Sequence, residues 1–237
     1  MNADPVDLQR NYYAATADRY DDWHVHAEHE HNFALMFMIS FLEKFSVNSV
    51  LDIGSGTGRA LLEIKKALPG VKILGIEPSS ELRAIGYSKG LTKDELADGD
   101  AMNLRFGDGA FDLVCEFGAL HHIPNPRKAV AEMLRVSRRA IFISDSNNYG
   151  QGNKMQRLLK QSLNAAGLMN IAYKIKTHGK GYEITDDDGL AYFYSVFDDY
   201  EQIASKCKKI HMLNTTNAGP NLYDTASHVA LLGVKEL

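Results

Sequence analysis

One short stretch limits the possible folds more than any other: residues 50–61, VLDIGSGTGRAL. A buried apolar run ends at Asp52, three glycines follow at alternate positions, and a helix-like sequence begins. Glycines allow positive φ and let the backbone approach a ligand closely, while the free N–H groups at a helix N-terminus bind hydrogen-bond acceptors. The stretch therefore predicts a strand, a tight turn and a helix that together hold a nucleotide-like cofactor.

Apolar strand patterns alternate with helical patterns from residue 47 to residue 144. This alternation favours right-handed crossovers and an α/β fold: a doubly wound, mostly parallel sheet with helices on both faces. Ligands bind at the carboxyl ends of the strands in such sheets. The predicted strands cover residues 47–53, 71–76, 96–101, 110–117 and 140–143, and the predicted helices cover residues 60–68, 81–88 and 126–136.

The two ends of the chain are less regular than its centre. Helical spacing at 5–22 and 28–44 indicates an N-terminal helical cap or lid over residues 1–45. Residues 46–237 are expected to form the cofactor-binding domain, with a β-prone insertion on the substrate side at about 167–197. Further elements are predicted in the last third: helices at 153–166 and 198–206, and strands at 209–213 and 227–234.

The composition is that of an ordinary globular protein, with 45% hydrophobic residues, 24% charged residues and a net charge of −4. This charge gives no general attraction for nucleic acid. Two distant cysteines indicate no disulfide framework, and neither a signal peptide nor a membrane-spanning run is recognised. We therefore expect a cytoplasmic protein, monomeric or homodimeric, that binds neither nucleic acid nor a membrane.

Acidic residues follow the predicted strands at the same edge of the sheet. Asp52 suits a cationic or amine-bearing ligand and is unfavourable beside a pyrophosphate. Glu77 can accept two hydrogen bonds from ribose hydroxyls, and Pro78 can pack on a purine ring. Asp100 can accept from an exocyclic amine while the Ala101 N–H donates to a ring nitrogen.

The glycine spacing separates the possible cofactors. A dinucleotide fold needs G-x-G-x-x-G, whereas the third glycine here, Gly58, comes one position early. The lysine and hydroxyl residue that end a P-loop are also missing from this turn. The D-x-G-x-G-x-G pattern after a buried strand is a more specific indication of the type of cofactor site than glycines alone.

Four segments resemble motifs of the class I S-adenosylmethionine-dependent methyltransferases: VLDIGSGTG, GIEP, GDAMNLRFGDGAFDLV and FGALHHIPNP. These motifs are most similar to those of the small-molecule methyltransferases of ubiquinone and menaquinone biosynthesis. The resemblance implies a seven-stranded Rossmann-like sheet, S-adenosyl-L-methionine as cofactor and S-adenosyl-L-homocysteine as product. The cofactor-binding residues that it implies, together with the candidates above, are Asp52, Gly54, Ser55, Gly56, Gly58, Glu77, Pro78, Asp100, Ala101, Phe117 and Tyr20.

The expected activity is methyl transfer to an O or N atom of a small-molecule acceptor. Two alternatives stay open. A nicotinamide-dependent oxidoreductase would share the fold, although the glycine spacing argues against it, and a regulatory protein could bind the cofactor without catalysis. The stretch at 171–197, rich in tyrosine and phenylalanine, could line an acceptor pocket and favours an enzyme.

Three residues near the expected ligand face are candidate catalytic groups: His121, His122 and Asp145. Either histidine could be a general base, because histidine titrates near neutrality, but both could simply shape their loop. Asp145 could face the acceptor or cap the next turn. Tyr12, Tyr13 and Tyr20 either cover the cofactor or pack within the N-terminal helices.

Histidines and acidic residues also gather at residues 24–31, which carry His24, His26, Glu28, His29, Glu30 and His31. Their spacing fits no standard metal motif such as H-E-x-x-H, so a solvated helix start is the preferred interpretation. The run at 186–188 lacks the remaining ligands of a calcium loop and predicts a turn. No metal is expected.

Overall fold

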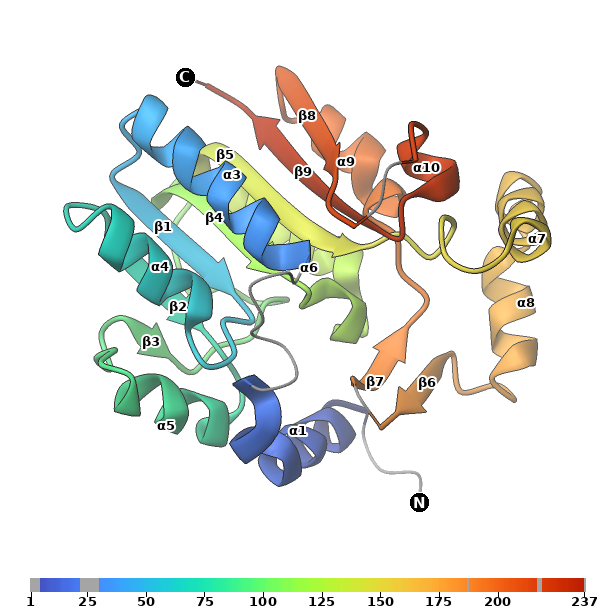
Figure 1. Ribbon diagram of the computed structural model, residues 1–237, viewed down its shortest axis with the longest axis horizontal. Coiled ribbons are helices and arrows are strands. Elements are labelled where there is room, and N and C mark those ends of the chain that lie inside the picture. The colour runs from blue at the N-terminus through green and yellow to red at the C-terminus, as the bar shows by residue number, and fades with distance from the viewer. Residues whose placement is uncertain (1–4, 22–29, 187, 217–218, 237) are drawn as a thin grey trace.

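The computed structural model describes residues 5–21, 30–186, 188–216 and 219–236. One seven-stranded sheet has the order β3-β2-β1-β4-β5-β9-β8 (Figure 1). Only β9 among these strands runs against its neighbours, so the predicted mostly parallel sheet is confirmed. The strands are β1 Ser49–Ile53, β2 Lys72–Ile76, β3 Leu96–Ala97, β4 Phe111–Phe117, β5 Ser137–Ser146, β8 Lys209–Asn214 and β9 His228–Val234.

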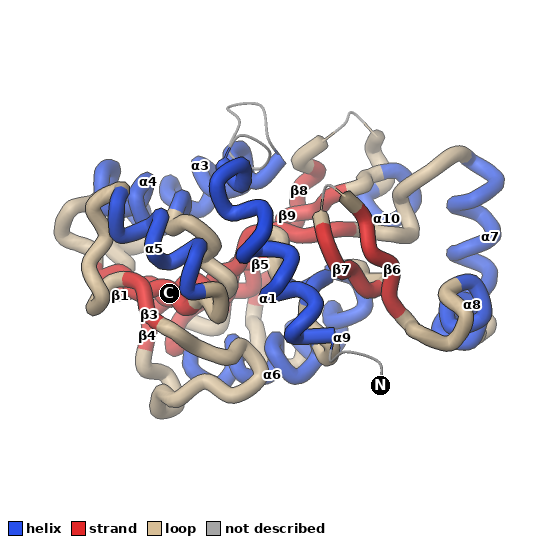
Figure 2. Tube along the Cα trace, turned by 90° about the horizontal axis from the view of Figure 1, so that it is seen from below, coloured by secondary structure: helices blue, strands red, loops and turns tan. Residues whose placement is uncertain are grey.

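Helices cover both faces of this sheet (Figures 1 and 2), because successive strand residues point to opposite sides. On one face, α3 (Glu30–Lys44) and α4 (Arg59–Ala67) pack on Val50, Leu113 and Phe142. On the other, α6 (Pro126–Val136) and α9 (Tyr200–Ala204) pack on Leu51, Val114 and Ile141. The two hydrophobic layers make the sheet a rigid support for whatever lies at its ends.

The remaining elements surround the carboxyl edge of the parallel strands. Figure 1 shows α1 there, between α5 and a separate two-stranded hairpin, β6–β7. The other elements lie in the last third and in short turns. The bounds of all these remaining elements are α1 Pro5–Thr16, η1 Ala17–Arg19, α5 Ser80–Ser88, η2 Leu120–His122, α7 Lys154–Ala165, α8 Met169–Lys176, β6 Tyr182–Thr185, β7 Gly189–Tyr192, η3 Val196–Asp199 and α10 Leu222–Thr225.

The predicted β-prone stretch at 171–197 is wrong over its first residues, which belong to helix α8. Met169 and Tyr173 are four residues apart, and both are buried against Tyr149. A spacing of four places them on one side of this helix. The third strand is also shorter than predicted and pairs with β2 only through Leu96 and Ala97.

Asn147 fixes the chain where it leaves β5. This fully buried side chain donates from its amide nitrogen to the carbonyl oxygens of Leu222, Tyr223 and Ala226, at 3.0, 2.9 and 2.8 Å. Its amide oxygen accepts from the Ser195 hydroxyl at 2.9 Å. One side chain thereby joins the end of β5 to two distant segments.

The division at residue 45 stays a prediction. Within residues 1–45, α3 packs on the sheet with the main core, whereas α1 lies beside α5 and β7. In the part of the chain described, no helix is both long enough and apolar enough to cross a membrane.

Candidate active site

A cavity of about 240 Å³ lies at the carboxyl ends of β1, β2 and β4. β1 is also the point where the strand order reverses, which is where doubly wound sheets bind their ligands. Seven of the eleven predicted cofactor residues line it: Gly54, Glu77, Pro78, Asp100, Ala101, Phe117 and Tyr20. The other four, Asp52, Ser55, Gly56 and Gly58, are buried around the turn behind its wall.

The glycine turn after β1 has the left-handed backbone that its sequence predicted. Gly54 has φ of 66°, and a Cβ there would come within 2.5 Å of the Ala119 Cβ. Gly56 has φ of 55°, and its added Cβ would lie 2.7 Å from the Tyr20 hydroxyl. Side chains at these two positions would fill the space between the turn and its neighbours. Ser55 points away from the cavity and donates to the Asp52 carbonyl at 3.0 Å.

Glu77 joins the turn to the next helix. Its carboxylate accepts from the Gly56 N–H at 3.0 Å and from the Ser79 N–H at 2.8 Å. Burial raises the pKa of this carboxyl to about 7. Each oxygen keeps a further lone pair on the cavity side of the turn, so Glu77 can still accept hydrogen bonds from a ligand.

Asp52 and Arg59 place opposite charges behind the turn. Burial raises the pKa of Asp52 to about 7. The Arg59 guanidinium interacts electrostatically with this carboxyl group and lies 6.0 Å from the centre of the Phe117 ring. Burial lowers the pKa of Arg59. Arg59 was not among the predicted site residues, although a basic residue directly after the last glycine was the available signal.

Asp100 and Ala101 follow β3 and line the cavity opposite the turn. One carboxylate oxygen of Asp100 accepts from the Met102 N–H at 2.8 Å, which fixes the loop. The other oxygen and the Ala101 backbone are available to a ligand on this side.

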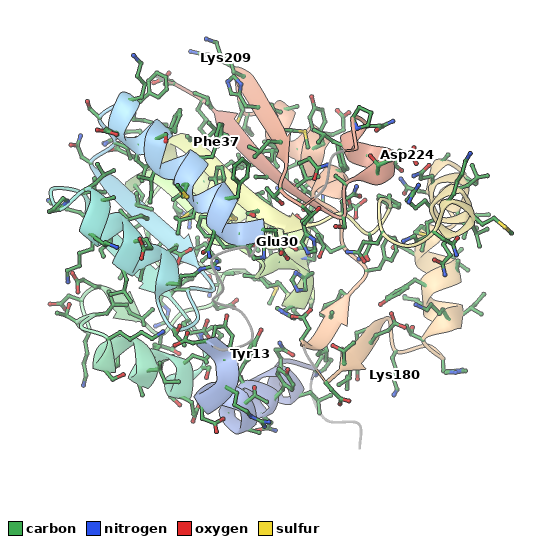
Figure 3. All side chains as sticks on the ribbon, in the orientation of Figure 1. Tyr13, Glu30, Phe37, Lys180, Lys209 and Asp224 are labelled. Atoms are coloured by element: carbon green, nitrogen blue, oxygen red, sulfur yellow. The ribbon has the colours of Figure 1, made fainter. Side chains whose placement is uncertain are left out.

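The roof of the cavity is α1, which is held by a distant part of the sequence, the β6–β7 hairpin. Gln9 on α1 accepts from the Leu190 N–H on β7 at 2.6 Å, and the Tyr12 hydroxyl donates to the Asp186 carbonyl at 2.9 Å. Tyr13 lines the cavity beside Tyr20, with ring centres 5.7 Å apart. Figure 3 shows Tyr13 on the side of α1 that faces the sheet. Tyr12 instead points to the hairpin.

His121 and His122 lie on the short turn after β4, below this roof. The His121 Nδ1 is 2.6 Å from the Asp145 carboxylate, and its Nε2 is 3.2 Å from the Asp188 carboxylate. The His122 Nδ1 is 2.7 Å from the Leu190 carbonyl oxygen, and its Nε2 is 3.3 Å from Asp188. His122 lines the cavity. Asp188 was not among the predicted site residues, because the acidic run around it predicts only a turn.

Asp145 acts through neighbouring groups because it has no exposed surface. It accepts from the Leu120 N–H at 2.9 Å and holds His121. Burial would raise the pKa of Asp145, but charged His121 outweighs it and lowers that pKa to about 2. The pKa of His121 is raised well above its usual value, since Asp145 and Asp188 overcome the opposing effect of burial.

One group of described residues has metal-ligating atoms close together: His121, His122 and Asp188, all within 4.8 Å of one another. The predicted histidine cluster lies largely outside the described residues, which exclude His24, His26, Glu28 and His29. Its two described members take separate partners. His31 Nδ1 is 2.8 Å from the Ser144 hydroxyl, and Glu30 pairs with His228 at 3.3 Å.

Comparisons with known proteins agree with this arrangement. Residues 51–142 match the family model described as a methyltransferase domain. An uncharacterized methyltransferase of Bacillus subtilis, YcgJ, is 33% identical over 129 residues, which cover 52% of this chain and 49% of YcgJ. The demethylmenaquinone methyltransferase of Porphyromonas gingivalis is 33% identical over 106 residues, covering 41% of this chain and 42% of that protein.

Solved structures show the same fold over nearly the whole chain. Magnesium protoporphyrin IX methyltransferase from Synechocystis, with bound S-adenosylhomocysteine, superposes with a TM-score of 0.65. The superposition covers 98% of this chain and 100% of that one, at 15% identity. The chain spans about half the length of the first curated relatives that it matches.

Proposed function

We propose that this chain is a class I S-adenosylmethionine-dependent methyltransferase that moves the methyl group of that cofactor to an oxygen or nitrogen atom of a small molecule. Similarity to relatives named as methyltransferases favours methyl transfer over the two alternatives left open by the sequence, a nicotinamide oxidoreductase and a non-catalytic binding protein. S-adenosylmethionine is therefore the cofactor.

The observation that carries the proposal is the Glu77 carboxylate, bonded to two backbone N–H groups and facing the cavity. We assign it to the ribose hydroxyls. Asp52 and Arg59 carry the charges that suit the ammonium and carboxylate of the methionine part, and Phe117 suits the sulfonium through its ring face. Asp100 with Ala101 suits the adenine edge.

The acceptor is assigned to the cavity side on which His122 and Tyr13 lie. Methyl transfer from a sulfonium breaks the carbon–sulfur bond and forms a carbon–oxygen or carbon–nitrogen bond in line with it. A hydroxyl or amine acceptor must also lose a proton. We assign His121, His122 and Asp145 to this step, with buried Asp145 acting through His121. Two similar proteins are named for small acceptors, a demethylmenaquinone and a magnesium porphyrin.

The same proposal gives the outer segments their roles. The N-terminal segment up to residue 45 supplies the roof through α1, and the insertion at about 167–197 supplies the hairpin that joins it. Together these segments exclude water from the acceptor side.

Calorimetry with S-adenosylhomocysteine tests the cofactor assignment. Wild type should bind it, and Glu77→Gln should bind about tenfold to 100-fold more weakly, because charged hydrogen bonds contribute about 1.5–3 kcal/mol. Glu81→Gln is the matched control, since its carboxylate is exposed in the next helix. Binding of NADH without S-adenosylhomocysteine would contradict the proposal. Mass spectrometry of metabolite mixtures with a labelled methyl donor then identifies the acceptor.

A further inference from the structure

The two adjacent histidines have their tautomers fixed by their outer neighbours. His121 Nδ1 faces the ionised Asp145 carboxylate at 2.6 Å, and His122 Nδ1 faces the Leu190 carbonyl oxygen at 2.7 Å. Both neighbours only accept hydrogen bonds, so both Nδ1 atoms carry hydrogen. The Gln9 amide nitrogen approaches His122 Nδ1 more distantly, at 3.3 Å. When the Nε2 atoms carry no proton, both present lone pairs.

Those two lone pairs point at a third acceptor. Asp188 places one carboxylate oxygen 3.2 Å from His121 Nε2 and the other 3.3 Å from His122 Nε2. Three electron-pair donors within 4.8 Å repel one another unless positive charge lies between them. Either two additional protons or one divalent cation supplies it.

We propose that His121, His122 and Asp188 bind one divalent transition-metal ion of the zinc class. Two imidazole nitrogens and one carboxylate oxygen suit such ions, whereas magnesium and calcium prefer all-oxygen sites. The contacts of Asp145 and Leu190 are those that commonly orient metal-binding histidines from behind. Three protein ligands also leave a coordination position open, as in catalytic zinc sites.

The position of the ion indicates its role in the reaction. This part of the inference rests on the proposed methyl transfer. His122 lines the cavity, and we assign the open position to that side, where the acceptor is proposed to lie. A hydroxyl bound there would have a lowered pKa and release its proton to water. A remaining lone pair on its oxygen would then take the methyl group as the carbon–sulfur bond breaks, leaving neutral S-adenosylhomocysteine. The inferred acceptor class is therefore a small molecule with a hydroxyl oxygen that can coordinate a metal.

Metal titration of the full chain, freed of metal by a chelator, tests this inference directly. We expect one Zn²⁺ per chain by calorimetry at the proposed site, and a visible ligand-field spectrum with Co²⁺. Asp188→Asn and His122→Ala should each lower Zn²⁺ affinity by more than the roughly 10- to 100-fold loss caused by removing an outer partner. Asp186→Asn and His211→Ala should leave it unchanged, because both residues are exposed and outside the cluster.

Two results would overturn the inference. One is an absence of Zn²⁺ and Co²⁺ binding by wild type, as expected if two protons occupy the cluster. The other is metal binding that Asp188→Asn and His122→Ala leave intact, which would assign it to other histidines. Thermal unfolding confirms that both variants are folded. S-adenosylhomocysteine binding is measured separately, so loss of the metal site and failure of the methyltransferase proposal give different results.

Discussion

Lowering the pH through about 7 should weaken cofactor binding, because two buried carboxyl groups that titrate there adjoin the cofactor turn. Burial raises the pKa of Asp52 from 3.8 to about 7 and that of Glu77 from 4.5 to about 7. With folded-state values raised, both groups are protonated below about pH 7 and ionised above it. The cofactor carries a sulfonium and an ammonium group, so it favours the ionised forms, and bound protons must leave when it binds.

The size of the effect follows from these pKa values. At about pH 6, one unit below both, removing one proton costs about 1.4 kcal/mol, or about tenfold in affinity. If both groups ionise, affinity at pH 6 is about 100-fold lower than at pH 8, where the cost nearly vanishes. Asp52→Asn and Glu77→Gln each remove one group, so each variant should retain only about a tenfold dependence.

Calorimetry in buffers of different ionisation enthalpy measures both the affinity and the number of protons released. Near pH 6, wild type should release close to two more protons per bound S-adenosylmethionine than the double variant with both Asp52→Asn and Glu77→Gln. Each single variant should release about one more proton than this double variant. Glu81→Gln should behave as wild type. An affinity that does not change between pH 6 and 8, or a release unaltered by either substitution, would refute the reasoning.

Two further substitutions test the fold that supports the site. Gly54→Ala forces a side chain into positive φ and against Ala119, which costs at least about 1–2 kcal/mol, so S-adenosylhomocysteine affinity should fall about tenfold or more. Gly70→Ala, with open space around it, should bind normally. Asn147→Ala removes several buried hydrogen bonds and should lower the free energy of denaturant unfolding by about 3 kcal/mol. An equal loss in Asn148→Ala would contradict that account.

The central sheet was predictable because local patterns specify it. A buried strand ending in Asp52, the glycine turn and a helix leave little choice of arrangement, and right-handed crossovers extend it. Glu77 and Asp100 were predictable as cavity residues for the same reason, since carboxyl ends of parallel strands share one edge.

Contacts between distant segments were not predictable. Asp188 meets His121 only because the hairpin folds back over the turn after β4, and periodicity says nothing about that return. Gln9 likewise binds Leu190 from the opposite end of the sequence. The position of β9 between β5 and β8 is set by pairing across the sheet, which its own apolar pattern does not encode.

The roof over the cavity has a consequence for the speed of turnover. α1 is held to the hairpin by hydrogen bonds such as those of Gln9 and Tyr12, and Asp21, just after η1, accepts from Thr57 in the glycine turn at 2.7 Å. Each such bond contributes only about 0.5–1.5 kcal/mol. Separating the roof from the sheet therefore costs far less than global unfolding, and it belongs with loop motions of microseconds to milliseconds. Backbone amides of α1 and β7 should accordingly exchange hydrogen faster than those of β1 and β4. Under the proposed function, opening of the roof precedes the release of S-adenosylhomocysteine and limits the rate of each cycle.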